Sequence, residues 1–272
     1  MRPGGALRAI FITGASSGIG EALAYHYAAP GRTLGLVGRR EAALRAVAER
    51  CRTRGAATAC FSADVRDAAA IQDAASTFLI QAGGIDLVIA NAGISRRDDE
   101  CAEGAGIPRD VMATNFFGAV QTLMPFVPAM EDARAGSLVA ISSVAGLRGL
   151  PNAGAYCASK AALNVWMESL RGRLGGRVHV MTVCPGFVAT AMTASNPFPM
   201  PWLLTSDQAA TRISEAVRRG VPVLVFPFPM RWLMRVVKWV PPRLYDRLVV
   251  GLRSRRPQLF QRRLDDHGNK GP

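Results

Sequence analysis

Short apolar runs alternate along the chain with longer segments in which apolar and polar residues follow helical spacing. Runs that are apolar throughout, rather than at every second position, are typical of strands buried on both faces of a sheet. Strands separated by helices form a parallel sheet with right-handed crossovers. The pattern therefore predicts one doubly wound α/β domain. We expect strands at Ala9–Thr13, Thr33–Val37, Thr58–Ser62, Asp86–Asn91, Ser137–Ser142, Val178–Cys184 and Val221–Phe226, and helices at Gly18–Ala29, Glu41–Arg54, Ala68–Gln81, Pro108–Glu131, Gly154–Leu174 and Ser206–Arg219. Pro125 and Pro128 should end or kink the long helix at Pro108–Glu131.

The pattern changes after the last expected strand. Arg231, Arg235 and Lys238 follow one another at i, i+4 and i+7, which places them on one face of a helix, and apolar residues occupy much of the remaining circumference. We therefore divide the chain into an α/β domain over 1–226 and a basic amphipathic C-terminal extension over 227–272.

The extension has two interpretations that the sequence leaves open. Basic residues with tryptophan at helical spacing are typical of a helix that lies in a membrane interface, here over 227–256, with a second basic amphipathic segment at 244–252 after Pro241 and Pro242. The alternative is a helical cap or a subunit interface built on the same apolar face. No apolar run reaches the roughly 18 residues of a spanning helix, and features that read nucleic-acid bases are missing, so we expect no nucleic-acid partner.

Composition limits the kind of protein this can be and the cellular compartment in which we expect it. Hydrophobic residues make up 49% of the 272 residues, which is ample for a core. The formal net charge is +13, and residues 231–272, with 11 Lys/Arg and 3 Asp/Glu, carry +8 of it. The five cysteines are scattered and never spaced as C-x-x-C, so we expect neither disulfides nor a metal site. No apolar leader precedes the first strand, so we expect a cytoplasmic protein. If the extension binds lipid, the protein would be peripheral on the inner face of a membrane.

The glycine-rich stretch "TGASSGIG" at 13–20 allows two kinds of chemistry. Gly14-x-Ser16-x-Gly18 has the spacing of a hydrolase nucleophile elbow, but that elbow needs an acid and a histidine further along the chain. His26, His179 and His267 lie in a helix, a strand and a polar tail. The other interpretation is a turn from the first strand into the first helix, where glycines let the backbone approach a phosphate and helix N–H groups face it. We favour the dinucleotide site.

The end of the second expected strand indicates which dinucleotide. An acidic residue there holds a ribose 2′-hydroxyl, whereas arginine suits a 2′-phosphate. This chain has Gly38, Arg39 and Arg40 at that point. Because guanidinium groups grip phosphate with paired, charge-assisted hydrogen bonds, we expect NADP(H) to be favoured over NAD(H).

Tyr156 and Lys160 stand four residues apart, one above the other on one helix face. A cation beside a phenol favours the phenolate, so we expect the pKa of Tyr156 to lie below its usual value of about 10. A phenol tuned in this way exchanges protons near neutral pH. Ser143, thirteen residues before Tyr156, ends a strand where its hydroxyl can hold a carbonyl oxygen, and Ser142 is the neighbouring alternative.

Taken together, these motifs resemble the classical short-chain dehydrogenase/reductase family over residues 7–226. The resemblance implies a Rossmann-type sheet in the order 3-2-1-4-5-6-7 and a homodimer or homotetramer. It implies hydride transfer between a nicotinamide and a small-molecule carbonyl or secondary alcohol. The matching motifs are "TGASSGIG" (13–20), "ADV" (63–65), "NAG" (91–93), Asn115 in "ATNFFG", "SS" (142–143), "YCASK" (156–160) and "PGFVAT" (185–190).

The resemblance also implies a role for each matching residue. Tyr156 corresponds to the general acid/base, Lys160 to its activator, and Asn115 to the holder of a proton-relay water in a bent helix. Ser143, which the thirteen-residue offset from Tyr156 selects over Ser142, corresponds to the hydroxyl that orients the carbonyl. With Arg39 and Arg40, the expected cofactor contacts are Gly14, Ser16, Ser17, Gly18, Ile19, Gly20, Asp64, Val65, Asn91, Ala92, Gly93, Tyr156, Lys160, Pro185, Gly186, Val188 and Thr190.

The stretch after Thr190 covers the substrate in that family, and here it is apolar and rich in proline. We expect an apolar substrate, such as a lipid-like or alicyclic ketone. The competing class of function is a non-catalytic, membrane-associated dinucleotide-binding protein. The expected apolar lining is Phe187, Met192, Phe198, Met200 and Trp202.

Overall fold

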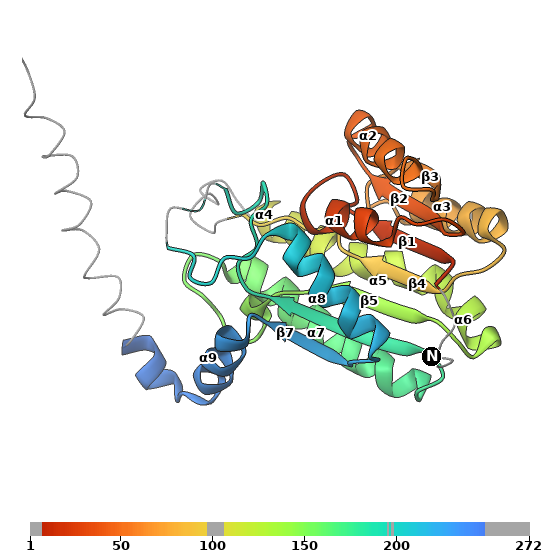
Figure 1. The fold of residues 1–272 in the computed structure, drawn as a ribbon. Helices are drawn as coiled ribbons and strands as arrows, with labels where there is room; N and C mark the ends of the chain where they lie inside the picture. Colours follow the sequence, from red (N-terminus) through yellow and green to blue (C-terminus); the bar gives the residue numbers. More distant parts are fainter. Residues whose placement is uncertain (1–6, 97–105, 195, 197–198, 248–272) are drawn as a thin grey trace, which may run out of the picture. The chain divides into compact units, whose positions relative to one another are not determined.

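A seven-stranded parallel sheet forms the centre of the molecule (Figure 1). The computed structural model describes residues 7–96, 106–194, 196 and 199–247. The strands follow the order β3-β2-β1-β4-β5-β6-β7, which confirms the predicted doubly wound fold and its strand order. The strands are β1 (Ala9–Thr13), β2 (Thr33–Gly38), β3 (Ala57–Ser62), β4 (Leu87–Ala90), β5 (Ser137–Ile141), β6 (His179–Pro185) and β7 (Val223–Phe226).

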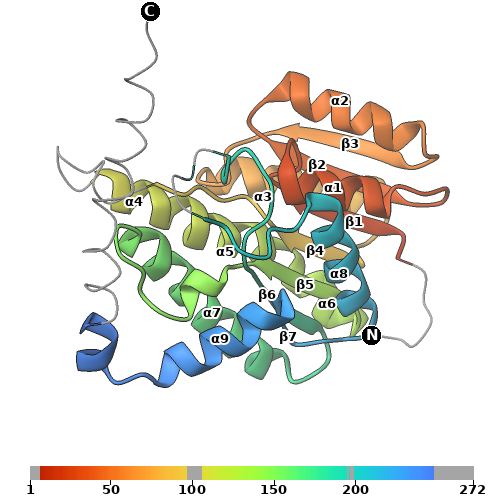
Figure 2. The same cartoon turned by 60° about the vertical axis from the view of Figure 1, so that its left-hand side comes forward.

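Helices cover both faces of the sheet (Figures 1 and 2). Alternation along β1 divides the core into two clusters, because Ile10 and Ile12 face one helical layer and Phe11 faces the other. The first layer consists of α1 (Gly18–Tyr27), α2 (Glu41–Arg52) and α8 (Ser206–Arg218). The second consists of α3 (Ala68–Ala82), α5 (Gly118–Leu123), α6 (Val127–Ala133) and α7 (Gly154–Leu174).

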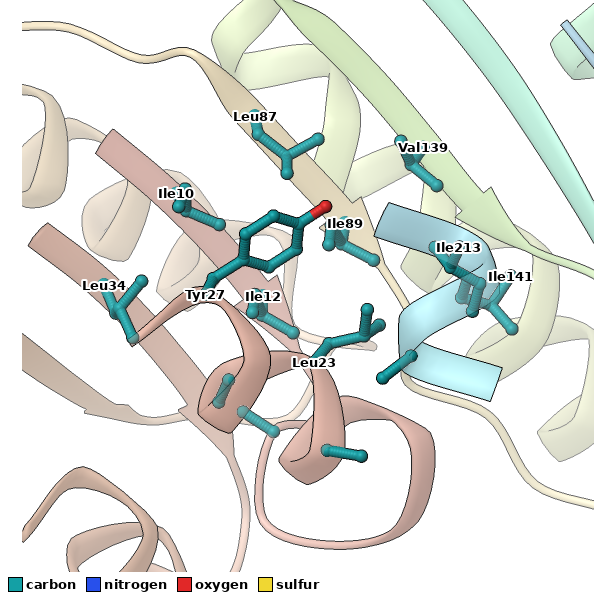
Figure 3. Packing of buried hydrophobic residues seen from close by; sticks show 14 of the residues in the cluster. Ile10, Ile12, Leu23, Tyr27, Leu34, Leu87, Ile89, Val139, Ile141 and Ile213 are labelled. Carbon is teal, nitrogen blue, oxygen red and sulfur yellow. The ribbon is translucent and has the colours of Figure 1, made fainter. Parts of the chain in front are cut away.

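The first cluster encloses one polar group, the hydroxyl of Tyr27 (Figure 3). Tyr27 closes α1 and its side chain lies among Ile10, Ile12 and Leu87. It is 3% exposed, and its oxygen has no hydrogen-bond partner among the described residues. Burial raises the pKa of this phenol far above its usual value, so Tyr27 stays neutral.

The two edge strands depart from the predicted pattern of full burial. All residues of β3 are exposed or half-buried, and Val223 at the start of β7 is 47% exposed. An edge strand has one sheet neighbour and fewer helices over it, so part of its side chains face water. The five inner strands are buried almost throughout.

The long helix expected at Pro108–Glu131 is interrupted at Pro125, as expected, and also at a π turn further upstream, which was not expected from the spacing. α4 (Gly106–Met112) passes into a π-helical turn, η2 (Ala113–Phe117), before α5 begins. A 3₁₀ turn, η3 (Met124–Phe126), holds Pro125 and leads into α6. Proline lacks the N–H that an α-helix would use there, which accounts for the second interruption.

The described chain ends with α9 (Phe228–Trp239), followed by a helical stretch over 242–247. The chain divides into two compact units, Met1–Arg231 and Trp232–Pro272. The division at 226/227 expected from the sequence stays a prediction, and residues 248–252 of the expected second amphipathic segment lie outside the described residues. None of the helices in the described ranges has the length and apolar character needed to cross a bilayer.

Candidate active site

A cavity of about 400 Å³ opens where the strands end at their carboxyl termini. Gly14 follows β1, Arg39 follows β2, Asn91 follows β4, Ser143 follows β5 and Gly186 follows β6, and all five line it. Ligands of doubly wound sheets bind at this edge, where the strand order reverses. The strand order alone therefore brings together residues that are more than 170 positions apart in the sequence.

The glycine turn has the geometry of a phosphate cradle. Gly14 and Gly18 have φ angles of +67° and +59°, in the left-handed region where glycine costs least. The side chain of Ser17, which precedes α1, makes no capping hydrogen bond, so the first N–H groups of the helix remain available to an anion. A Cβ on Gly20 would come within 2.3 Å of the Gly14 carbonyl oxygen, which explains the glycine at the third position of α1. Gly20 lies behind the cavity rather than on its wall.

Asn91 holds this turn in place. Its amide nitrogen donates to the carbonyl oxygens of Thr13, at 3.1 Å, and Gly14, at 3.2 Å. Its backbone N–H donates to the Thr13 hydroxyl at 3.3 Å. The strand end expected to contact a ribose therefore also braces the phosphate turn.

Cationic side chains gather beside the end of β2. A terminal nitrogen of Arg40 lies 3.4 Å from the hydroxyl oxygen of Ser16, and a terminal nitrogen of Arg39 lies 3.6 Å from a carboxylate oxygen of Asp64. Arg66 donates to Asp64 at 2.8 Å, and this hydrogen bond is the main reason that the pKa of Asp64 lies below its usual value. The Arg39 side chain is 63% exposed, so it can turn toward a ligand at small cost.

Tyr156, Ser143 and Lys160 meet on the opposite wall. The Ser143 hydroxyl forms a hydrogen bond with the phenol of Tyr156 and accepts from the N–H of Ala145 at 3.1 Å. Ser142 instead donates to the Lys160 carbonyl oxygen at 3.2 Å. Of the two adjacent serines, the structure therefore places Ser143 at the tyrosine.

The pKa of Tyr156 shifts opposite to the sequence-based expectation. Burial raises it above its usual value, and the hydrogen bond with Ser143 opposes that shift only in part. The Lys160 ammonium donates to the Ile141 carbonyl oxygen at 2.8 Å and lies 5.9 Å from the centre of the phenol ring. Burial also lowers the pKa of Lys160 to about 8. Helical spacing brought the two groups near each other but could not reveal that both are desolvated.

Asn115 lies in the π turn η2 and is fully buried. Its amide oxygen accepts from the Ile94 N–H at 2.8 Å, and its nitrogen donates to the Ile94 carbonyl at 2.9 Å. The same nitrogen donates to the Ser159 hydroxyl at 3.0 Å, and that hydroxyl donates to the Tyr156 carbonyl oxygen at 2.8 Å. The extra residue of the π turn directs Asn115 inward, where it joins the loop that follows β4 to the helix that carries Tyr156.

The loop after β6 closes the cavity. Thr193 donates to the Val188 carbonyl at 2.7 Å and accepts from the Thr190 N–H at 3.1 Å. Of the expected apolar substrate lining, Met192 is on the cavity wall and is 41% exposed. Phe198 lies outside the described residues. Phe187, Met200 and Trp202 are described but do not line this cavity.

Most of the expected site residues therefore come together in one place. Ser16, Ser17, Ile19, Val65, Ala92, Gly93, Pro185, Gly186, Val188 and Thr190 line the cavity with those described above, while Gly20 and Asn115 support it from behind. No histidine is among the described lining residues, which removes support for a hydrolase triad on Ser16. The sequence-based reasoning missed Ile94, Thr114, Ser159 and Thr193. Ile94, Thr114 and Ser159 stand within or beside quoted motifs, whereas Thr193 carried no separate signal.

The fold and the cavity define a dinucleotide-binding α/β protein with a tyrosine, a lysine and a serine at its catalytic wall. The family model for short chain dehydrogenases matches residues 8–198. The chain belongs to the short-chain dehydrogenase/reductase family. It is accordingly an oxidoreductase that acts on alcohol and carbonyl groups.

Two curated relatives show the range of the resemblance. An uncharacterized oxidoreductase of Myxococcus xanthus is 37% identical over 240 residues, which cover 88% of this chain and 95% of the relative. The 11-beta-hydroxysteroid dehydrogenase 1A of Arabidopsis thaliana is 34% identical over 225 residues, covering 82% of this chain and 61% of that protein.

Solved structures agree with the fold. A short chain dehydrogenase/reductase from Burkholderia phymatum, in complex with NAD, is 27% identical with a TM-score of 0.76, over 84% of this chain and 92% of that one. A short-chain dehydrogenase from Sphingobium yanoikuyae, in complex with NADPH, is 25% identical with a TM-score of 0.75, over 93% of this chain and 97% of that one.

Proposed function

We propose that this protein is an NADP(H)-dependent oxidoreductase that interconverts a carbonyl and a secondary alcohol on an apolar small molecule. The observation that carries the proposal is the meeting of Tyr156, Ser143 and Lys160 with a glycine turn in one cavity. Two alternatives remain for the test: a protein that binds the dinucleotide without catalysis, and one that prefers NAD(H).

Tyr156 is the proton donor in this proposal. Its raised pKa keeps the phenol protonated at neutral pH, which is the form that a general acid needs. The Ser143 hydroxyl, already hydrogen-bonded to the phenol, holds the carbonyl oxygen beside it. The Lys160 cation stabilises negative charge as it develops on the tyrosine. The bound nicotinamide supplies the hydride for reduction and accepts it for oxidation.

Asn115 maintains the path by which Tyr156 regains its proton. It fixes the Ile94 backbone through two hydrogen bonds, and a Cβ built on the adjacent Gly93 would lie 3.2 Å from its oxygen and 3.6 Å from the Lys160 nitrogen. A water held there by the Ile94 carbonyl and Lys160 would connect the tyrosine to solvent.

The cavity lining offers a place for each part of the dinucleotide in this proposal. The turn at Gly14 and Gly18 and the uncapped start of α1 suit a pyrophosphate. Asp64 and Val65 would border the adenine, and Tyr156 and Lys160 the nicotinamide ribose. Pro185, Gly186, Val188 and Thr190 would border the nicotinamide ring.

The test of catalysis is Tyr156→Phe. Because the phenol is the proton donor, we expect kcat for NADPH-dependent ketone reduction to fall by at least about a hundredfold, with the Kd for NADPH unchanged. Tyr25→Phe, which removes a hydroxyl on α1 instead, serves as the control and keeps full activity. A Tyr156→Phe protein that retains most of its turnover contradicts the assignment. A wild-type protein that binds NADPH but oxidises none of it across a panel of apolar ketones supports the non-catalytic alternative.

The preference for NADP(H) rests on the two arginines at the end of β2. Arg39→Asp places a negative charge where we expect the 2′-phosphate. The ratio of kcat/KM for NADPH over NADH should fall by about tenfold or more, as expected when an interaction with a charged group is lost. Arg45→Asp, an equal charge change on α2, is the control. If the ratio of kcat/KM for NADPH over NADH is unchanged in Arg39→Asp, Arg39 does not contact the 2′-phosphate.

The apolar substrate class is supported by Met192 on the cavity wall and by the similarity to a protein described as a hydroxysteroid dehydrogenase. An alicyclic or lipid-like ketone is the class that we propose to test first. We further propose a homodimer or homotetramer in the cytoplasm that works at the inner face of a membrane. The scattered free cysteines and the apolar, basic surface of α9 support that location.

A further inference from the structure

The helix α9 exposes a stripe of large apolar side chains. Trp232, Val236 and Trp239 follow one another at i, i+4 and i+7, so they share one side of the helix. They are 53%, 63% and 84% exposed. Burying apolar surface of this size against a partner contributes about 25 cal/mol for each Å² removed from water.

Basic residues run beside this stripe. Lys238 is exposed and directly precedes Trp239. Successive residues of an α-helix are about 100° apart around its axis, so Lys238 lies beside the apolar stripe. Arg231 is also exposed, and Arg235 stands between the two in the same helical register. Arg243 and Arg247 continue the positive charge into the helical stretch 242–247, where Asp246 is the one acidic residue. Two tryptophans therefore lie next to a row of cations.

This combination favours a lipid surface over a protein partner. The buried centre of a protein interface is depleted in lysine, because a cation there loses its water without regaining it. A bilayer interface accepts both groups: the indole rings insert at the level of the headgroups and the cations remain among anionic phosphates. The length of α9, 12 residues, suits a helix that lies in the interface plane.

We infer that α9 docks in the headgroup layer of an anionic phospholipid bilayer, with Trp232, Val236 and Trp239 inserted and Lys238 at the phosphates. This inference deepens the proposed membrane location by naming the lipid chemistry and the contact face, and its link to catalysis rests on the proposed function. An enzyme of apolar ketones gains from lying where such molecules concentrate.

The experiment is co-sedimentation of the full-length protein with vesicles. One set contains phosphatidylcholine alone, and the other contains equal parts of phosphatidylcholine and phosphatidylglycerol. The wild-type protein should bind the anionic set more tightly, and added salt should weaken that binding because it screens the cations. Trp232→Ala/Trp239→Ala should weaken binding to the anionic set by at least about tenfold, and Lys238→Glu by about fivefold.

Matched changes outside α9 serve as controls. Ile80→Ala removes an apolar side chain that is 83% exposed on α3, and Arg218→Glu reverses a charge on α8. Both should bind vesicles like the wild type. Equal binding by the wild type and the double tryptophan variant overturns the inference, as does a lack of binding or equal binding to both lipid sets. A double variant that instead loses its oligomeric state in size-exclusion chromatography shows that a second copy covers the stripe, which also overturns it.

A parallel assay separates this inference from the proposed function. Reduction of a water-soluble ketone should proceed equally in the wild type and in the double tryptophan variant, because neither residue touches the cavity. Vesicle binding by a wild-type protein that reduces no ketone would contradict the proposed function and leave the lipid contact in place.

Discussion

Burial determines the protonation state of the two titratable groups at the catalytic wall. The Tyr156 phenol has a raised pKa and the Lys160 amine has a pKa lowered to about 8, both because the cavity wall excludes water from the charged form. At neutral pH the pair is therefore a neutral phenol beside an ammonium group. The site is poised to give a proton rather than to take one.

These protonation states of Tyr156 and Lys160 predict opposite pH dependences for reduction and oxidation. Reduction needs the protonated phenol, so its kcat/KM should stay level from pH 6 to about 8. Above that it should fall, first as Lys160 loses its charge and then as Tyr156 ionises. Oxidation needs the phenolate and should rise with pH over the alkaline range. Initial rates at saturating cofactor measure both profiles, and a reduction rate that climbs from pH 6 to 8 contradicts the assignment.

The same lysine affects stability, and the sign follows from its two pKa values. The folded-state value of about 8 lies below the ordinary value of 10.5, so the unfolded chain binds more protons between them. The free energy of unfolding therefore gains from Lys160 as the pH rises from about 8 to 10.5. Below pH 8 the buried Lys160 ammonium lowers the free energy of unfolding by a constant amount. The fold is therefore less stable at neutral pH than it would be with a solvated lysine, although the site needs this cation for its proposed chemistry.

Local sequence sufficed for some site residues and failed for others. The spacing of Tyr156 and Lys160 predicted their common face because one helix turn fixes it. The link from Asn115 through Ser159 to the Tyr156 carbonyl joins two segments about 44 residues apart. No local sequence pattern predicts such a contact, because it forms only after both helices have packed.

At the scale of elements, α1 shows how one helix serves both the site and the core. Its start, at Gly18 and Gly20, adjoins the phosphate turn, and its end places Tyr27 among the apolar residues beneath the sheet. The hydroxyl of Tyr27 is a polar group without a hydrogen-bond partner among the described residues. A buried group of this kind costs about 1–3 kcal/mol relative to one that is satisfied.

We predict that Tyr27→Phe leaves the free energy of unfolding unchanged or raises it by about 1 kcal/mol, because it removes that buried hydroxyl and keeps the ring. Tyr25→Phe is the matched comparison on the same helix. Its hydroxyl donates to Glu21 at 2.8 Å, so its loss should cost about 0.5 to 1 kcal/mol. Urea denaturation of the two variants measures the difference. Destabilisation of Tyr27→Phe beyond that of Tyr25→Phe would indicate a partner for the buried oxygen, such as an internal water.

At the scale of the whole molecule, the two helical layers differ in what they show to solvent. On the layer with α5 and α7, Phe117 at the end of the π turn is 53% exposed and Val165 on α7 is 67% exposed. Large apolar residues exposed on neighbouring helices are typical of an interface between copies of a chain. The surface of α9 is different in kind, because cations accompany its apolar residues.

We therefore predict that Val165→Arg shifts the predicted homodimer or homotetramer toward smaller species, because it places a charge at the centre of an apolar contact. Analytical ultracentrifugation at several protein concentrations measures the change. Ile80→Arg, at an exposed position on α3, is the control and should leave the assembly intact. A wild-type protein that sediments as a monomer throughout contradicts the oligomer, and an unchanged Val165→Arg assembly places the interface elsewhere.

By itself, the sequence determined the parallel sheet and the motif residues of the dinucleotide site, and the resemblance carried by those motifs implied the strand order. Burial on both faces appears in the sequence as unbroken apolar strands, and the glycine turn, "YCASK" and the paired arginines are local features. Only the tertiary structure decided the exposed edges of β3 and β7, the π turn that holds Asn115, and the raised pKa of Tyr156. Each of these depends on what packs against a residue from a distant part of the chain, because desolvation and long-range hydrogen bonds arise only when the elements have assembled.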